Sequence, residues 1–591
     1  MADNVSEDKI LDDAGGAEFE KGFTESISSG NSGKLAIVGL GALAGVLAVY
    51  LLRLDGVVGL TIDDAWYVLL AKTLATGHGY TLVNSPTPGI LPLYPPGFPF
   101  LLSIFYRISP NFPDNVWLLK SVSIAAMIGA GFLSYRYFNR TRALPGSLAL
   151  LIAVGMALCP PLVFLATSTV MSECVFAFIL IATIIVAERC AQAVREKNKK
   201  AYLFIIASAA LASYAFLTRS IAVALIGGLF LYYLKERMVR AALIFGIAVA
   251  LFAGPWVIYT RLHAPTPPQM EEQGGHIIQP YDRQFWQRVA SVTTSDAITV
   301  SELPSRVWNN ILEIAGKDIF RVFATPLYEA LRDPYKEAQR FLTRELTDKT
   351  EDTLALSFVL SLFVIIGYIA TAREKVTCAE IAIPMLLGIT VLWPWETIRF
   401  VAPLAPFLIF YFVIGFRVIH RLVRRFLNRQ SQQPSTESGL WIIPGVVAAL
   451  VIAINLYGHL NYINKKLNDG LDRPQWLQTF ADVETMMKWV NQNVPKNETL
   501  VTLNPPLVNL YTGNKTVGWE KPAEKWDLWR RLGARHLIWF AAFYVPAEPE
   551  QRNYNQIYRA RNQLGFQVLD LGPAESRIPW GASATTNSTG N

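Results

Sequence analysis

Residues 35–54, LAIVGLGALAGVLAVYLLRL, form an apolar run, and residues 61–67, TIDDAWY, follow it after a short connection. The run is long enough to cross the hydrocarbon core of a bilayer, which takes about 20 residues in a helix. The adjacent carboxylates Asp63 and Asp64 therefore lie close to the membrane surface. Ionisable groups at this depth lose hydration, so they usually have a task or a partner. The pair is the first candidate for acid or base chemistry on a substrate that arrives in the lipid.

The composition favours a membrane protein over a set of soluble domains. Hydrophobic residues make up 52% of the 591 residues, charged residues only 17%, and the mean hydropathy is +0.30. A window reading predicts about eleven membrane spans. They are residues 35–54, 116–135, 146–165, 170–187, 201–217, 220–234, 241–260, 354–371, 379–395, 400–416 and 440–458. We expect a polytopic α-helical membrane protein.

The net charge of +7 is concentrated in a few loops and is not the footprint of a nucleic-acid-binding protein. Lys and Arg gather at residues 136–142, 189–200, 235–240, 373–375 and 417–429. The positive-inside rule places such basic loops in the cytoplasm. All five agree with a multi-pass protein of the cell membrane (inner or plasma membrane) with a cytoplasmic N-terminus and an extracytoplasmic C-terminus.

This topology divides the chain into four regions. Residues 1–33 are acidic and rich in Gly and Ser, which predicts a disordered cytoplasmic tail. Residues 34–458 form the transmembrane domain, with large outer loops at 55–115 and 262–353. Residues 459–580 alternate helical and strand patterns and predict a small extracytoplasmic α/β domain, followed by a disordered tail at 581–591. Within the α/β domain we expect helices at 476–492 and 551–563 and strands at 499–503, 536–540 and 566–571.

The first outer loop has a pattern of its own. Residues 63–76 predict a helix with Asp63 or Asp64 at its N-cap, and glycines on either side of His78 end it. After a proline-marked loop, Tyr94-Pro95-Pro96 opens an apolar stretch that runs to Ile108. We interpret this stretch as a helix that lies at the membrane interface.

Only a few ionisable residues lie near the outer ends of spans: Asp63, Asp64, Glu173, Arg219, Glu396 and Arg399. Outer-end arginines run against the positive-inside bias, and anchoring a phosphate would explain Arg219 and Arg399, because guanidinium matches phosphate geometry. The structural alternatives are an N-cap role for Asp63, snorkelling for Arg219 and a structural ion pair or cap for Glu173. The topology places these acids and arginines at one face, which favours a shared site.

The sequence shows no metal constellation. The four cysteines have no CxxC spacing, and the six histidines have no metal-ligand spacing. His78, between glycines, reads as a loop residue, and the adjacent Asp pair is not the DxD pattern of nucleotide-sugar enzymes. We expect no cofactor, with a divalent cation at the acids as an open alternative.

These motifs resemble the GT-C glycosyltransferases, in particular the bacterial relatives of the protein O-mannosyltransferases, which include the lipid A aminoarabinose transferases. The similarity covers about residues 30–580. The matching residues are Asp63-Asp64-Ala65-Trp66-Tyr67, Gly77, Gly79, Tyr94-Pro95-Pro96, Met171-Ser172-Glu173, Leu217-Thr218-Arg219, Gly254-Pro255-Trp256 and residues 399–406. Asp64 stands where the family often has Glu, and Trp66 and Tyr94 stand where the aminoarabinose enzymes have Arg and Lys. These departures argue against that particular donor chemistry.

The resemblance implies a hexosyl- or pentosyltransferase that uses a lipid-linked sugar. A sugar would move with inversion from a polyprenyl-phosphate donor to a hydroxyl of a glycan, lipid or protein acceptor at the extracytoplasmic face of the bilayer. Asp63 would be the base, Asp64 and Glu173 would orient it or the acceptor, and Arg219 and Arg399 would bind the donor phosphate. Tyr67, His78 and Tyr94 would line the acceptor side of the cavity. A transporter or flippase of lipid-linked or envelope precursors, or a membrane-anchored scaffold, are the alternatives.

Overall fold

The computed structural model describes residues 32–273, 276–288, 296–331, 354–427, 441–468, 473–519, 528–529, 531–540, 555–559 and 566–571. The two predicted disordered tails lie outside these residues, apart from residues 32–33, which belong to the first helix. Three parts of the second outer loop, residues 274–275, 289–295 and 332–353, lie outside them as well.

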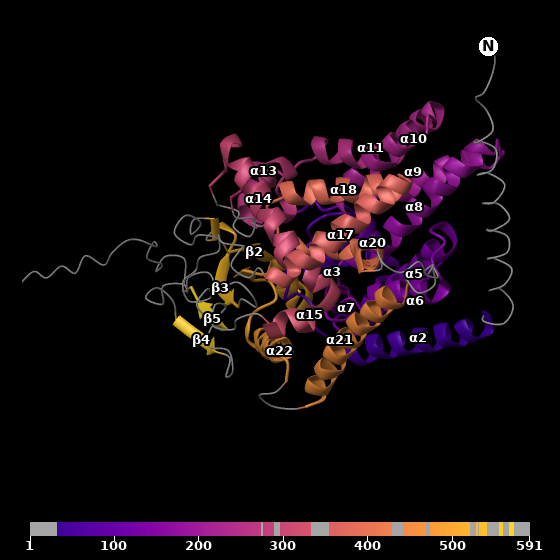
Figure 1. Cartoon of the computed structure of the whole chain (residues 1–591). Helices are drawn as coiled ribbons and strands as arrows, with labels where there is room; N and C mark the ends of the chain where they lie inside the picture. Colours follow the sequence, from indigo (N-terminus) through magenta and orange to yellow (C-terminus); the bar gives the residue numbers. More distant parts are fainter. Residues whose placement is uncertain are drawn as a thin grey trace, which may run out of the picture.

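A bundle of apolar helices makes up most of the described chain (Figure 1). Among the described residues, eight helices are long and apolar enough to cross a membrane. They are α2 (Ser32–Arg53), α5 (Val116–Arg136), α8 (Glu173–Arg195), α9 (Ala201–Thr218), α11 (Val239–Leu262), α17 (Ala355–Glu374), α20 (Ala405–Leu427) and α21 (Ile442–Leu467). The prediction of a polytopic helical membrane protein is therefore confirmed.

The remaining predicted spans are also helical but are bent or short. The segment at 146–165 consists of α6 (Gly146–Ala157) and α7 (Pro160–Thr167), which meet at an angle of 51°. Pro160 begins α7, because proline lacks the N–H that a continuous helix would need there. The segments at 220–234 and 379–395 contain the shorter helices α10 (Val223–Lys235) and α18 (Cys378–Leu392).

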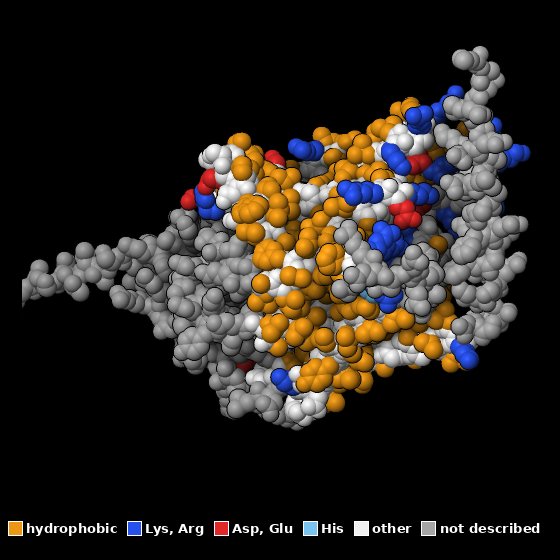
Figure 2. Space-filling model, viewed as in Figure 1, with side chains coloured by type: hydrophobic (Ala, Val, Ile, Leu, Met, Phe, Trp, Pro, Cys, Tyr) orange, Lys and Arg blue, Asp and Glu red, His pale blue; other side chains and the backbone are white. Residues whose placement is uncertain are grey.

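The surface of the bundle is apolar, as expected for a protein that faces lipid. Figure 2 shows a broad hydrophobic band over the helices, and most of the visible Lys and Arg side chains gather toward the end opposite the C-terminal domain. Leu251 on α11 is 70% exposed, and Ile37 on α2 is 72% exposed. Apolar side chains this exposed on long helices are stable in lipid, where no water has to be ordered around them.

Shorter helices cover the end of the bundle that carries the C-terminal domain. They are α3 (Asp63–Ala75), α4 (Gly97–Ile108), α12 (Pro267–Gln273), α13 (Tyr281–Trp286), α14 (Leu303–Glu313) and α15 (Ile319–Leu331). α3 and α4 confirm the two helices predicted in the first outer loop. Phe98 of α4 is buried whereas Phe100 is 58% exposed, so α4 has one face on the protein and one apolar face outward.

The C-terminal domain is a five-stranded mixed sheet with two described helices. Its strands are β1 (Thr499–Thr502), β2 (Thr516–Gly518), β3 (Ala534–Trp539), β4 (Asn555–Arg559) and β5 (Gln567–Asp570), in the order β2-β1-β3-β5-β4. β1 is parallel to β2 and β3, whereas β5 is antiparallel to β3 and β4. The helices are α22 (Gln475–Asn493) and α23 (Pro505–Thr512).

The helix predicted at 551–563 was wrong, because the described part of that segment is strand β4. Tyr558 pairs with Val568 of β5, so β4 completes the edge of the sheet. Pairing with a neighbouring strand outweighed the local helical pattern, as tertiary context often does for short segments.

The C-terminal domain is bonded directly to the loops of the membrane domain. The Thr516 amide donates to the Asn84 carbonyl at 2.7 Å, and Lys515 Nζ donates to the Val83 carbonyl at 2.8 Å. Buried Glu272 of α12 accepts hydrogen bonds from Thr87 and thereby ties α12 to the same loop. The first outer loop is therefore held between the helical bundle and the sheet.

Candidate active site

Asp63, Glu173, Arg219 and Arg399 form one group of ion pairs, which we call the acid–arginine cluster. Arg399 Nη1 lies 2.8 Å from Asp63 Oδ2, and Arg399 Nε lies 2.8 Å from Glu173 Oε1. Arg219 Nη1 lies 2.9 Å from the same oxygen of Glu173. The Glu173 side chain is 0% exposed, whereas those of Asp63 and Arg399 are 23% and 29% exposed. Asp63 and Arg399 are therefore the part of the cluster that a substrate can reach.

Four helix ends bring these side chains together. Asp63 and Glu173 are the first residues of α3 and α8, so each carboxylate also lies at the positive end of a helix dipole. Arg219 follows the last residue of α9, and Arg399 lies in the short helix α19 (Ile398–Val401). Four of the six outer-end residues read from the sequence thus meet at one place in the fold, whereas Asp64 and Glu396 make no ion pair with them among the described contacts.

Ser172 joins the cluster, although sequence reasoning did not select it. Its hydroxyl oxygen accepts from Arg219 Nη1 at 3.1 Å and lies 3.3 Å from the Tyr67 hydroxyl. A serine just before a helix usually caps the first turn with its side chain, yet Ser172 makes no such bond. The position of this serine, directly before Glu173 in the sequence, could have indicated that it belongs to the site. The Phe400 ring, 5.2 Å from the Arg219 guanidinium, adds a cation–π contact that no sequence pattern indicated.

Tyr94 holds the second oxygen of Asp63. Its hydroxyl donates to Asp63 Oδ1 at 2.8 Å, and its ring lies 5.8 Å from the ring of Tyr67. Burial, followed by the nearby Asp63 charge, raises the pKa of Tyr94 well above its usual value, so the hydroxyl keeps its proton and remains a donor. The Tyr80 hydroxyl donates to the Tyr94 carbonyl at 3.0 Å and fixes the loop that presents this ring.

Asp64 points away from the cluster, and the predicted N-cap role of the Asp pair was wrong. Its Oδ2 accepts from the Gly59 amide at 2.8 Å and its Oδ1 from the Thr61 hydroxyl at 2.7 Å. Burial raises the pKa of Asp64. The N-cap residue of α3 is Ile62, and no side chain caps it. The two carboxylates separate because Arg399 holds Asp63 while the preceding turn holds Asp64.

His78 lies apart from the cluster. It is exposed in the turn after α3, where its Nδ1 lies 2.8 Å from the Thr76 hydroxyl oxygen. No described contact joins it to the acid–arginine cluster. Within the residues that the structure describes, no group of three or more His, Cys, Asp and Glu side chains is arranged to hold a metal ion.

Asp318 contacts the segment that contains Arg399, and no sequence pattern indicated this role. It is buried in a π-helical turn at Ile314–Asp318 and accepts a hydrogen bond from the Thr397 hydroxyl. Burial, followed by repulsion from Glu313, raises the pKa of Asp318 to about 7. A group from the second outer loop thus lies one contact behind the arginine of the site.

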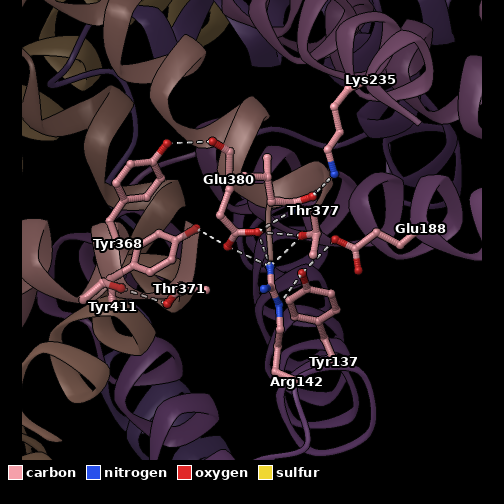
Figure 3. Close-up of polar contacts among 11 residues, drawn as sticks. Tyr137, Arg142, Glu188, Lys235, Tyr368, Thr371, Thr377, Glu380 and Tyr411 are labelled. Carbon is pink, nitrogen blue, oxygen red and sulfur yellow. Dashed lines mark hydrogen bonds and ion pairs between the residues drawn. The ribbon is translucent and has the colours of Figure 1, made fainter. Parts of the chain in front are cut away.

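A second buried charge network lies toward the other ends of α5 and α8 (Figure 3). Arg142 Nη2 lies 2.9 Å from Glu380 Oε1 and donates to the Thr377 hydroxyl oxygen at 2.8 Å. The Tyr137 hydroxyl donates to Glu188 at 3.1 Å, so the network ties α8 to the start of α18. These contacts fix one end of α18, and the chain leaving its other end leads to Arg399.

No family model and no curated protein matches this chain. Among solved structures, ArnT from Cupriavidus metallidurans bound to undecaprenyl phosphate matches with a TM-score of 0.52 and 11% identity, over 90% of this chain and 97% of that one. The Archaeoglobus fulgidus oligosaccharyltransferase tethered with an acceptor peptide matches with a TM-score of 0.50 and 11% identity, over 84% of this chain and 68% of that one. At these identities the likeness shows the fold. The chain has the GT-C membrane fold that the sequence motifs led us to expect.

Proposed function

We propose that this protein is a membrane glycosyltransferase that moves a sugar from a polyprenyl-phosphate donor to an acceptor hydroxyl at the extracytoplasmic face. The observation that carries the proposal is the ion pair between Asp63 and Arg399, with Arg219 and Glu173 behind it. It places a partly exposed carboxylate, able to accept a proton, beside guanidinium groups, able to hold a phosphate. The fold shared with ArnT bound to undecaprenyl phosphate supports the same class of donor.

The two arginines have donors to spare for a phosphate. A guanidinium has five N–H donors. Contacts among the described residues use Nη1 of Arg219 and Nε and Nη1 of Arg399. The buried Glu173 carboxylate keeps both arginines in place and offsets their charge before the donor binds.

We infer a transfer step that these positions support. The donor phosphate draws Arg399 toward itself and frees Asp63 Oδ2, while Tyr94 keeps Oδ1 in place. Asp63 then accepts the proton of the acceptor hydroxyl as its oxygen attacks the anomeric carbon with inversion. The bond from that carbon to the phosphate oxygen breaks, and the polyprenyl phosphate leaves as an anion stabilised by Arg219 and Arg399.

The test is complementation of a deletion strain, read out by lipid and glycan mass spectrometry. Loss of the protein should leave a lipid-linked sugar accumulated and an acceptor that lacks the sugar. Asp63→Asn should fail to restore transfer, with a loss of about 100-fold or more, because the amide cannot take the proton. Asp114→Asn is the matched control: Asp114 is exposed in the same outer loop, and this variant should restore transfer fully.

Two outcomes contradict the proposal. Full complementation by Asp63→Asn, at normal expression, would remove Asp63 as the base. An accumulated lipid-linked sugar confined to the cytoplasmic leaflet would favour the flippase alternative. Repeating the assay with and without a divalent-ion chelator decides whether a cation takes part.

A further inference from the structure

The turn directly before Asp63 has a strained backbone. Ile62 has φ 64° and ψ −55°, and the Asp63 amide donates to the Thr61 carbonyl at 2.7 Å. Together these define a γ-turn of the rare, non-inverse kind centred on Ile62. A β-branched residue is an outlier at positive φ, because its side chain crowds the backbone. Such a turn persists only where its surroundings hold it.

Asp64 holds the turn from one side. Its carboxylate accepts from the Gly59 amide and the Thr61 hydroxyl, which ties the last part of the connection between α2 and α3 to the first turn of α3. Gly59 has φ 88°, a conformation that glycine adopts without a steric cost. The Gly59 carbonyl accepts from the Ile62 amide at 3.1 Å, so Gly59 anchors the turn at both of its backbone groups.

Asn504 holds the same glycine from the C-terminal domain. Its buried Nδ2 donates to the Gly59 carbonyl at 2.6 Å, whereas its Oδ1 accepts from the Leu507 amide at 3.3 Å and caps α23. The fit is close, because a Cβ on Gly59 would lie 2.5 Å from Leu507 Cδ1. Asn504, the N-cap residue of α23, is thus bonded both to its own helix and to the turn that carries Asp63.

We propose that Asn504 is a positioning residue, through which the C-terminal domain sets the direction of Asp63 by way of Gly59 and the strained turn at Ile62. The inference rests on the proposed function, since Asp63 is the group being positioned. Without the Asn504 donor, Ile62 relaxes to negative φ, the start of α3 rotates, and Asp63 loses its alignment with Arg399 and Tyr94. Donor binding through the two arginines is affected less than turnover.

The test uses Asn504→Asp in the full-length protein, because aspartate keeps the cap acceptor for α23 and removes the donor to Gly59. We expect kcat to fall by about 10- to 100-fold, the cost of a small misplacement of a catalytic group, with the donor KM within threefold. Amide hydrogen exchange of residues 59–66 should become faster. The control is Asn509→Ala, which removes a buried hydrogen bond from α23 to the carbonyl of Asn514, just after the helix, and should change neither quantity.

A second variant separates positioning from a merely structural role. Ile62→Gly removes the strain of the turn, so adding it to Asn504→Asp should raise kcat at least fivefold above that of the single variant. Unchanged exchange of residues 59–66 in Asn504→Asp would overturn the proposal, and so would a kcat loss that Ile62→Gly does not reduce. The exchange measurement needs no assay of sugar transfer. It therefore tests the contact between Asn504 and the turn even if the proposed glycosyltransferase function is wrong.

Discussion

At the scale of single residues, the site depends on one buried carboxylate oxygen shared by two arginines. Glu173 Oε1 lies 2.9 Å from Arg219 Nη1 and 2.8 Å from Arg399 Nε. This shared oxygen holds both guanidinium groups at one place, and each guanidinium has further N–H donors. In the topology predicted from the sequence, both arginines lie at outer ends of spans, where the positive-inside rule disfavours them.

Arginine geometry, and not charge alone, should be required at Arg399. Arg399→Lys keeps one positive charge but cannot contact Asp63 and Glu173 with separate nitrogens. We expect the donor KM to rise by about tenfold or more, which corresponds to at least 1.4 kcal/mol of lost binding. The measurement is a donor titration of purified enzyme. Arg288→Lys, at the exposed pair with Glu302, is the control, and an equal effect there would contradict the assignment.

Asp318 should make stability depend on pH. Its pKa is raised to about 7, so between about pH 4 and 7 the folded protein holds a proton that the unfolded chain has released. The contribution of this group to the free energy of unfolding therefore falls as the pH rises through that interval. Glu313, Lys317 and Arg321 also act on this carboxyl and remain in place in the test.

The measurement is the melting temperature of wild type and Asp318→Asn between pH 4 and 7.5. The amide still accepts from Thr397 but does not titrate, so the variant should lose less stability with rising pH than wild type. Parallel profiles for the two proteins would show that Asp318 does not carry the effect.

At the scale of elements, α17 and α20 cross with their backbones in direct contact. A Cβ on Gly367 would overlap the Tyr411 carbonyl oxygen, and a Cβ on Gly415 would overlap the Phe363 carbonyl oxygen. Small residues allow this approach between helices in a membrane, where dispersion contacts replace the hydrophobic effect as the attraction. The pair matters for the site because α20 continues the segment that carries Arg399.

Gly367→Ala should therefore force α17 and α20 apart. We expect a loss of about 1–3 kcal/mol of stability, typical of overpacking, and a lower melting temperature in detergent. Gly388→Ala in α18 is the matched control, since a Cβ there meets nothing within 4 Å. That change should be neutral or slightly stabilising, because alanine favours helix more than glycine does. Equal losses in both variants would refute the close crossing.

The elements also show which parts of the secondary structure local sequence patterns can predict. The helix at α3 and the strand β1 follow from periodicity and turn residues and were predicted. Strand β4 was not, because its conformation depends on pairing with β5, which local propensity does not report. The prediction that Asp63 or Asp64 caps α3 was wrong for a related reason. Both carboxylates are bonded to groups outside the helix, Asp63 to Arg399 and Asp64 to the Gly59 amide.

At the scale of the whole molecule, charge separates the two ends of the bundle. Most visible Lys and Arg side chains lie opposite the C-terminal domain (Figure 2). A membrane between these ends would leave the basic end in the cytoplasm. In this orientation, which stays a prediction, the acid–arginine cluster and the sheet domain would lie on the extracytoplasmic side.

Thiol labelling in intact cells tests the orientation. The four native cysteines are buried, so an introduced exposed cysteine gives a clean signal. Asp114→Cys should react with a membrane-impermeant maleimide, and Lys199→Cys should react only after the cells are permeabilised. Both positions are exposed. The reverse labelling pattern would place the acid–arginine cluster on the cytoplasmic side and would contradict the proposed function.

The sequence by itself determined the membrane architecture and the helix that begins at Asp63. These follow from hydropathy and turn residues within about 20 positions, because crossing a bilayer imposes a local rule on composition. Only the tertiary structure decided that Asp63, and not Asp64, meets Arg399, 336 positions away. It also decided that Asn504 reaches Gly59. Contacts this distant in sequence depend on how whole helices and the sheet pack, which no local pattern contains.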